Sequence, residues 1–253
     1  MKVLILKEFR SNWRSFRYPA FLLVILFFAL LDPPMIAYMD EIIGYFAAGM
    51  EINFPDPTPA DAFASYLSDA SQIGLMVLIF VLMGSVAKEK ETGVAGWMLS
   101  KPVSRWQFLG AKYVVHCLII IFGILACSVL AYFYTMSLLG AVPLDQAALG
   151  TAALISFALL IASITFFFST ILKSPLQAGG AAIFIFFISG ILNMLVSNSA
   201  AADFYPNTLL ASILPLVNGT AGFSDIAGPL AVTLGLCLLL FIMAGLIFRK
   251  IEL

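Results

Sequence analysis

The sequence has few charged residues. Only 11% of its 253 residues are Asp, Glu, Lys or Arg, whereas 62% are hydrophobic. Charged residues make up about 25% of an ordinary soluble domain. This composition excludes a soluble fold of the same length, because the chain lacks the side chains for a hydrated surface. It indicates an integral membrane protein.

Cysteine and histidine are also scarce, with three Cys and one His in the chain. Cys117, Cys127 and Cys237 lie in apolar stretches without CxxC or Cys/His spacing, so a disulfide scaffold and a zinc site are both poorly supported. We expect His116 to be a polar residue at the membrane interface. No HExxH motif occurs, and no acid pair at membrane depth supports a lipid-modifying enzyme. We therefore expect neither a catalytic site nor a metal site.

A phosphate-binding loop of the form GxxxxGK[ST] is missing from the chain. That loop cradles nucleotide phosphates in its backbone N–H groups, so this chain is not expected to bind ATP in that manner. ATP and magnesium would belong to a separate subunit. We expect no cofactor on this chain and no nucleic-acid partner.

Alternate loops contain no Lys or Arg at all. The thirteen bases are confined to Lys2, Lys7, Arg10, Arg14, Arg17, Lys88, Lys90, Lys101, Arg105, Lys112, Lys173, Arg249 and Lys250. Ten of the fourteen acids fall in the opposite segments: Asp32, Asp40, Glu41, Glu51, Asp56, Asp61, Asp69, Asp145, Asp203 and Asp225. Lys and Arg are retained on the cytoplasmic side of a membrane. The pattern therefore predicts six spans with both termini cytoplasmic.

The expected architecture is an all-α polytopic membrane protein forming one domain, 1–253. The spans are predicted at about 18–38, 72–87, 113–139, 147–172, 176–196 and 226–248. A crossing needs about 20 apolar residues, so the first two are short, and Asp32-Pro33-Pro34 interrupts the first. No small-x-small site follows Leu31, which disfavours a cleaved signal peptide.

Two extracytoplasmic segments are expected, at 32–71 and 197–225. The second contains Leu209–Val217, an apolar run too short to span. We interpret this run as a re-entrant or interfacial piece.

Residues 1–17 predict a cytoplasmic amphipathic helix. Leu6, Phe9, Trp13 and Phe16 recur at helical spacing along one stripe. The neighbouring face carries Lys7, Arg10, Arg14 and Arg17. Such a helix can lie in the headgroup layer with its aromatic side chains in the lipid. It either only anchors the topology or also contacts a cytoplasmic partner.

The long cytoplasmic loop 88–112 reads KEKETGVAGWMLSKPVSRWQFLGAK. Its mixed-charge start, Lys88–Glu91, is typical of the solvated beginning of a helix. Gly93 and Gly96 each weaken that helix by about 1 kcal/mol relative to Ala. An apolar patch follows at Trp97, Met98 and Leu99. Pro102 ends the helix, Ser104 can cap the next one, and Arg105 restarts an amphipathic turn.

This loop resembles the coupling segment of type-2 ABC transporter permeases. In that family a Glu-x-Glu-x-Gly stretch precedes a Leu-rich turn, then Pro-x-Ser-Arg and a Lys at the next span. The matching residues here are Glu89, Glu91, Gly93, Leu99, Pro102, Ser104, Arg105 and Lys112. Val94 stands where Thr is common, and Gly96 where a second acid is common. The six-span layout and the basic N-terminal helix extend the resemblance to most of the chain.

The resemblance implies a coupling role toward an ABC ATPase subunit. The residues expected to make that contact are Glu89, Glu91, Gly93, Trp97, Met98, Leu99, Pro102, Ser104 and Arg105. It also implies a second permease copy, as a homodimer or related heterodimer, in a prokaryotic-type cell membrane. Gly179, Gly180 and Ala182 are candidates for the dimer interface, although packing within one protomer would explain these small residues equally well.

The function predicted from the sequence is that of the permease subunit of an ATP-driven exporter. Few polar residues occur in the spans, so a hydrophobic or amphipathic cargo is expected. One alternative is an ATP-independent secondary transporter or channel, which the shortage of intramembrane charge disfavours. Another is a non-transporting membrane scaffold or sensor that uses the acidic first loop.

Overall fold

The computed structural model describes residues 2–46, 56–100, 102–197 and 199–251. All regular secondary structure in these ranges is helical. Six of the helices are long and apolar enough to cross a membrane. The predicted all-α architecture with six membrane helices is therefore confirmed.

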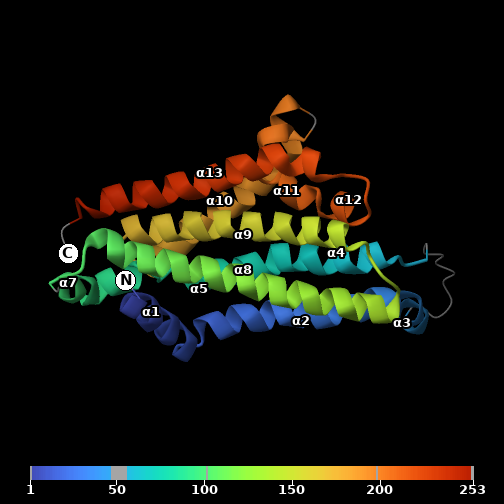
Figure 1. Cartoon of the computed structure of the whole chain (residues 1–253), viewed down its shortest axis with the longest axis horizontal. Coiled ribbons are helices and arrows are strands. Elements are labelled where there is room, and N and C mark those ends of the chain that lie inside the picture. The colour runs from blue at the N-terminus through green and yellow to red at the C-terminus, as the bar shows by residue number, and fades with distance from the viewer. Residues whose placement is uncertain (1, 47–55, 101, 198, 252–253) are drawn as a thin grey trace.

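The elements form one elongated helical bundle (Figure 1). In chain order they are α1 (Lys2–Arg14), α2 (Arg17–Ala37), α3 (Met39–Phe46), α4 (Pro59–Asp69), the π-helical turn η1 (Ala70–Gly74), α5 (Leu75–Leu82), α6 (Ala87–Glu91), α7 (Val94–Leu99), α8 (Arg105–Leu138), α9 (Leu144–Ile171), α10 (Pro175–Val196), the 3₁₀ turn η2 (Ala200–Phe204), α11 (Thr208–Ala211), α12 (Ile213–Val217) and α13 (Phe223–Phe248).

Both chain ends and α7 lie at the same end of the bundle, and α3 and α12 lie toward the other (Figure 1). The first end holds every described Lys and Arg, because α1, α6–α7, the α9–α10 turn and the end of α13 all meet there. We call it the basic end. The sorting of charge along the sequence is thus a sorting of charge in space.

Local sequence explains where several helices begin. The Thr58 hydroxyl accepts a hydrogen bond from the Asp61 amide at 3.2 Å, and Asp61 accepts one from the Thr58 amide in return. Ser104 and Gln107 make the same reciprocal pair at the start of α8, as predicted for Ser104. These contacts satisfy amide groups that the first turn of a helix leaves without partners.

The second span is much longer than the sequence indicated. It begins at Pro59 rather than near residue 72, and it continues through η1 into α5. Phe63, Tyr66 and Leu67 on α4 are buried in the bundle core. The helix that contains the second predicted span therefore begins inside the segment 32–71, which the sequence predicted to be extracytoplasmic. The part at 47–55, including Pro55, lies outside the described residues.

The first span continues through Pro33 and Pro34 to Ala37. Prolines are tolerated in membrane helices where neighbouring helices accommodate the freed backbone groups. Asp32, which the sequence assigned to the outside segment, lies within this helix and is only 3% exposed. Its Oδ2 atom has no partner among the described residues.

The third span also begins earlier than expected, at Arg105 instead of about residue 113. The segment 105–112 is therefore the first two turns of α8 and not part of a loop. Phe108 and Leu109, which lie in these two turns, are buried.

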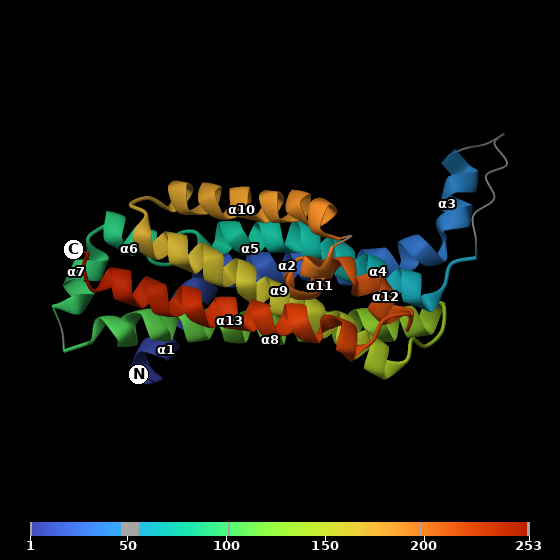
Figure 2. The ribbon, with the colours of Figure 1, turned by 90° about the horizontal axis from the view of Figure 1, so that it is seen from above.

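The central helix of the bundle is α9. It contacts α13, α10, α8, α5 and α12, and Figure 2 shows it running between α10 and α13. Its buried side chains include many small ones, such as Ala153, Ala158, Ala162 and Ser163. Without a hydrophobic driving force in lipid, helices associate through close packing, which small residues permit.

The apolar run Leu209–Val217 folds as two short helices, α11 and α12, that pack against α9. Leu209, Ile213 and Leu216 are buried there. The run therefore covers the side of the bundle near its end instead of crossing it.

Two glycines of α13 provide a test of the packing between α8 and α13. A Cβ at Gly245 would overlap the Trp106 ring, whereas a Cβ at Gly235 would meet nothing within 4 Å. We expect Gly245→Ala to lower the free energy of unfolding by about 1–3 kcal/mol, since forced overpacking has that cost. Gly235→Ala is expected to be neutral or stabilising, because Ala favours a helix. SDS titration of both variants in the same micelles measures the difference, and equal midpoints would contradict the assigned packing.

Candidate functional site

The segment with the coupling-loop pattern forms two short helices joined at a sharp turn. Gly93 sits between α6 and α7 with a φ of +73°, a left-handed conformation that favours glycine. The sequence predicted one weakened helix here, and the correction follows from this backbone angle. We call Ala87–Leu99 the elbow. Lys101, just beyond it, lies outside the described residues.

The elbow presents one side to the bundle and the other to its surroundings. Ala95 is fully buried, and Met98 and Leu99 pack against a cluster that contains Phe108 and Phe248. Trp97 is 66% exposed. The predicted apolar patch is therefore divided, with Trp97 outward and its two neighbours inward.

Several other predicted coupling residues lie on the surface. Glu91, Gly93, Pro102 and Ser104 are exposed. These four residues are accessible to another protein, whereas Glu89 and Arg105 are partly buried within this chain.

A buried ion cluster joins the elbow to α1 and α8. Lys112 Nζ lies 2.8 Å from Glu8 Oε2 and 2.9 Å from Glu89 Oε1. Lys112 is 2% exposed and Glu8 is 5% exposed. Since an unpaired charge in such a place is very costly, each charge here depends on the others.

Lys90 and Ser169 attach the elbow to α9. Lys90 Nζ donates to the backbone oxygens of Thr170 and Leu172, at 2.5 and 2.7 Å. The Ser169 hydroxyl accepts from the amides of Val86 and Ala87, both at 3.0 Å. The predicted solvated start of the helix, Lys88–Glu91, is thus wrong for Lys90 and Glu89, because both are held by partners.

Arg105 joins the start of α8 to the end of α13. Its Nη1 donates to the backbone oxygens of Phe248 and Ile251, and its guanidinium lies 5.7 Å from the centre of the Phe248 ring. Cations stabilise a helix C-terminus because the last carbonyl groups lack partners within the helix. Arg105 therefore connects two spans and is not only a surface charge.

The N-terminal helix meets the elbow directly. Lys7 Nζ lies 3.0 Å from Met98 Sδ, while Phe9 and Trp13 stack at 5.7 Å with both rings exposed. Arg10 and Arg14 are exposed. The structure thus brings together the two predicted sets, in α1 and in the loop 88–112. The interfacial position of α1 in a membrane stays a prediction.

The candidate dimer-interface residues do not share one face. A Cβ at Gly179 would overlap Met83 of the same chain, and Ala182 is 1% exposed. Both therefore pack between α10 and its own bundle, the alternative that the sequence left open for these small residues. Gly180 is exposed with open space around it, so it remains a candidate.

Sequence reasoning missed two parts of this site. Glu8 was not singled out, although it is the only acid among the five bases of 1–17, and that was the available signal. Ser169 carried no signal, because a hydroxyl near the end of an apolar span most often bonds back to its own helix. Thr151, Ser156 and Thr165 of the same helix do so.

Histidine 116 also departs from its predicted interfacial position. It is 3% exposed, and its Nδ1 lies 2.8 Å from the Tyr18 hydroxyl. The ring packs edge-on against Tyr18 and Phe166. This residue is a buried polar group of the bundle.

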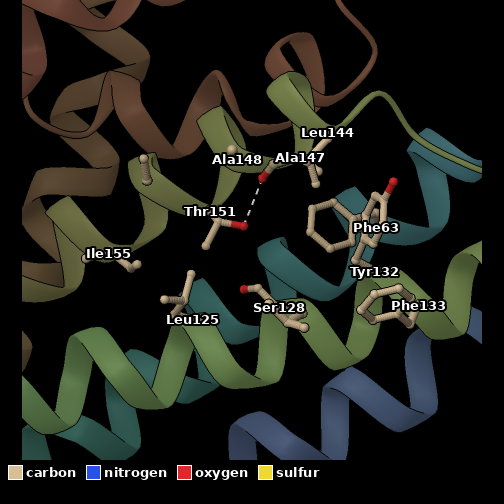
Figure 3. A pocket seen from close by; sticks show the side chains of 12 residues that line it. Phe63, Leu125, Ser128, Tyr132, Phe133, Leu144, Ala147, Ala148, Thr151 and Ile155 are labelled. Atoms are coloured by element: carbon tan, nitrogen blue, oxygen red, sulfur yellow. Dashed lines mark hydrogen bonds between the residues drawn. The ribbon is translucent and has the colours of Figure 1, made fainter.

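Toward the other end of the bundle, α4, α8 and α9 line an open apolar cavity of about 410 Å³. Figure 3 shows Phe63, Tyr132 and Leu144 around it. The hydroxyl of Thr151 donates to the Ala147 oxygen at 2.9 Å. The Thr151 hydroxyl therefore has its partner within α9, and the lining of the cavity is suited to an apolar group.

Comparison with known proteins identifies the class. Residues 38–249 match the family model described as ABC-2 family transporter protein. The chain belongs to the ABC-2 transporter family. An uncharacterized transmembrane protein of Bacillus subtilis (strain 168), YxlG, is 33% identical to it over 137 residues. That alignment covers 53% of each protein, so this chain matches about half the length of that relative.

Family membership agrees with the geometry of the basic end. The ABC-2 match runs from α3 through the elbow to α13, and it begins after α1 and α2. ABC-2 membrane proteins are transport subunits, the permease components of ABC transporters. The contact of Glu8 with Lys112 lies partly outside the matched region, and it connects α1 to that region.

The ion cluster yields a stability prediction. Lys112→Met is expected to lower the free energy of unfolding by about 3–5 kcal/mol, because it removes the buried cation from Glu8 and Glu89 and leaves only the more exposed Lys7 near them. Adding Glu8→Gln and Glu89→Gln should recover most of the loss. The control Lys7→Met removes a more exposed cation and is expected to cost less than about 1 kcal/mol. SDS titration in mixed micelles measures all three, and a Lys112→Met protein as stable as the parent would rule out the cluster.

Proposed function

We propose that this ABC-2 protein is the membrane-spanning permease of an ATP-driven exporter. Its motor is a separate ATPase subunit that docks on the elbow. The observation that supports this proposal best is the set of connections that the elbow makes. It is tied to α1 and α8 through Lys112, to α9 through Lys90 and Ser169, and it packs beside the end of α13.

Those connections give the elbow a mechanical role. A displacement of α6 and α7 changes the positions of the ends of four other helices, because rigid helices transmit movement at their ends along their length. The exposed Trp97 provides an anchor for a partner, since buried aromatic side chains dominate protein interfaces. Glu91, exposed beside it, can pair with a cation on the motor.

The proposed orientation places the basic end in the cytoplasm of a prokaryotic-type cell membrane. The positive-inside rule supports this, because the opposite end has no Lys or Arg among the described residues. We further propose assembly with a second copy of this chain or a related one. The apolar cavity in Figure 3 supports a hydrophobic or amphipathic cargo.

A secondary transporter is the second candidate, and one observation favours it. Asp32 is buried in a membrane helix with an unpartnered oxygen, and such acids often mark ion pathways. Flux that depends on membrane potential or pH in the absence of nucleotide would support this candidate over the ATP-driven one.

The docking proposal predicts uncoupled variants. Trp97→Ala is expected to weaken binding of the ATPase by roughly thirtyfold, the effect of losing an interface anchor worth about 2 kcal/mol. Glu91→Gln should also reduce the stimulation of ATP hydrolysis by the permease. The measurement is binding and hydrolysis with the ATPase that co-purifies with this chain.

Two matched controls remove similar groups from the opposite end. Phe223→Ala takes away an exposed aromatic ring and Glu41→Gln an exposed carboxylate. Both should bind and stimulate the ATPase as the parent does. If Trp97→Ala and Glu91→Gln also do so, the docking surface is elsewhere.

The orientation predicts the side from which introduced cysteines react. In a cysteine-free background, Asp203→Cys is expected to react with a membrane-impermeant maleimide added to intact cells. Lys173→Cys should react only after the membrane is opened. The reverse pattern would invert the proposed topology without affecting the fold.

A further inference from the structure

A polar cavity of about 280 Å³ lies beside the elbow, between α1, the start of α2, the α5–α6 turn and α8. Buried Ser85 and His116 line its inner part, and exposed Ser15 and Lys88 line its mouth. A cavity of this size and polarity holds several waters or one small polar ligand. The interactions that hold the elbow in place do not depend on this cavity being empty.

His116 lines this cavity and has one ring nitrogen without a partner within the described ranges. Its Nδ1 is occupied by the Tyr18 hydroxyl at 2.8 Å. A phenol is the better donor and an imidazole nitrogen the better acceptor, so Tyr18 donates and the proton of the neutral ring is on Nε2. That Nε2 is buried and has no partner among the described residues. Buried donors in native proteins are rarely left in this state.

Glu89 adds an acceptor to the same cavity. Its Oε1 binds Lys112 at 2.9 Å, but its Oε2 is buried and without a partner in the described part of the chain. Two residues that line the cavity therefore have unsatisfied atoms of opposite character, one donor and one acceptor. A ligand that satisfies both must itself contain an acceptor and a donor.

The charges around the cavity select an anion as the acceptor. Lys112 is already shared by Glu8 and Glu89. Arg17 and Lys88 form no ion pair with any described residue, and Arg17 has only a long hydrogen bond, 3.4 Å, to the Asn12 amide oxygen. Two cations without a described ion-pair partner thus line the same cavity as His116. Phosphate is the group that guanidinium and ammonium groups bind most readily in this arrangement.

We propose that this cavity binds a phosphorylated headgroup of the phosphoethanolamine type. Its phosphate oxygens accept from Arg17, Lys88 and His116 Nε2, and its ammonium group donates to Glu89 Oε2. The headgroup can come from a phospholipid of the surrounding membrane or from a free phosphate ester. The site is separate from the proposed motor surface at Trp97, and it does not require ATP-driven transport.

The single histidine makes the site directly observable. Because His116 is the only histidine of the chain, ¹⁵N-imidazole labelling of the purified full-length protein gives one pair of nitrogen resonances. Titration with glycerophosphoethanolamine is expected to shift the Nε2 resonance. Inorganic phosphate alone should bind at least about tenfold more weakly, since it does not bring a cation to Glu89.

The source of the headgroup is resolved by two lipid preparations. In nanodiscs, phosphatidylethanolamine should shift the Nε2 resonance, whereas phosphatidylcholine should not, because its quaternary ammonium has no N–H to donate. A shift with the lipid only assigns the site to the membrane. A shift of similar size with the soluble ester assigns it to a free ligand. Both results support the proposed chemistry.

Charge variants test whether binding is local. Arg17→Gln is expected to weaken binding at least about tenfold, and Lys173→Gln, which removes a base of the same end outside the cavity, should leave it unchanged. Equal losses in both variants would show non-specific attraction and overturn the proposal. A resonance that no probe moves at millimolar concentration would overturn it as well, and would leave a cavity filled with water. Neither result bears on docking of the ATPase.

Discussion

The burial of one cation, Lys112, determines how the basic end of this ABC-2 protein is organised. An ammonium group taken out of water needs partners close by, because the desolvation penalty is several kcal/mol per ion. Glu8 and Glu89 supply them from helices far apart in the sequence. The consequence is structural, since α1 and the elbow must both stay beside α8 as long as the charges remain paired.

Other polar contacts hold the rest of the elbow by satisfying backbone groups. Helix ends and the turn between two helices leave backbone amides and carbonyls without partners in a regular helix. Ser169 takes two of these amides, and Lys90 in turn caps the carbonyls at the end of α9. Gly93 permits the turn itself. Polar side chains near the ends of spans therefore satisfy backbone groups, as loop residues do in a soluble protein.

Apolar packing has a different role in the bundle. In lipid, apolar side chains lose little by facing outward, and many large ones on α10 and α13 are exposed. The helices are held where small residues allow a close approach, as Gly179 does at Met83 and Gly245 at Trp106. A stripe of small residues in a span can therefore form contacts within one protomer, as Gly179 does at Met83.

Some features were accessible from the sequence because they depend on composition over long stretches. Charge sorting and apolar length predicted six spans, and the pattern around Glu89, Pro102 and Arg105 indicated the family. The start of the second span was not accessible. Asp61 and Asp69 lower the average hydropathy of that segment, while in the folded chain Phe63 and its neighbours are buried among other helices.

The sequence by itself determined the class of this protein, since a membrane acts on each span according to its own hydrophobicity and flanking charge. Only the tertiary structure decided which charged residues are paired with one another. Lys112 and Lys173 are both bases at the basic end, but one is buried between two carboxylates and the other is outside that cluster. The difference arises from contacts between helices that are distant in the chain, and no local pattern records them.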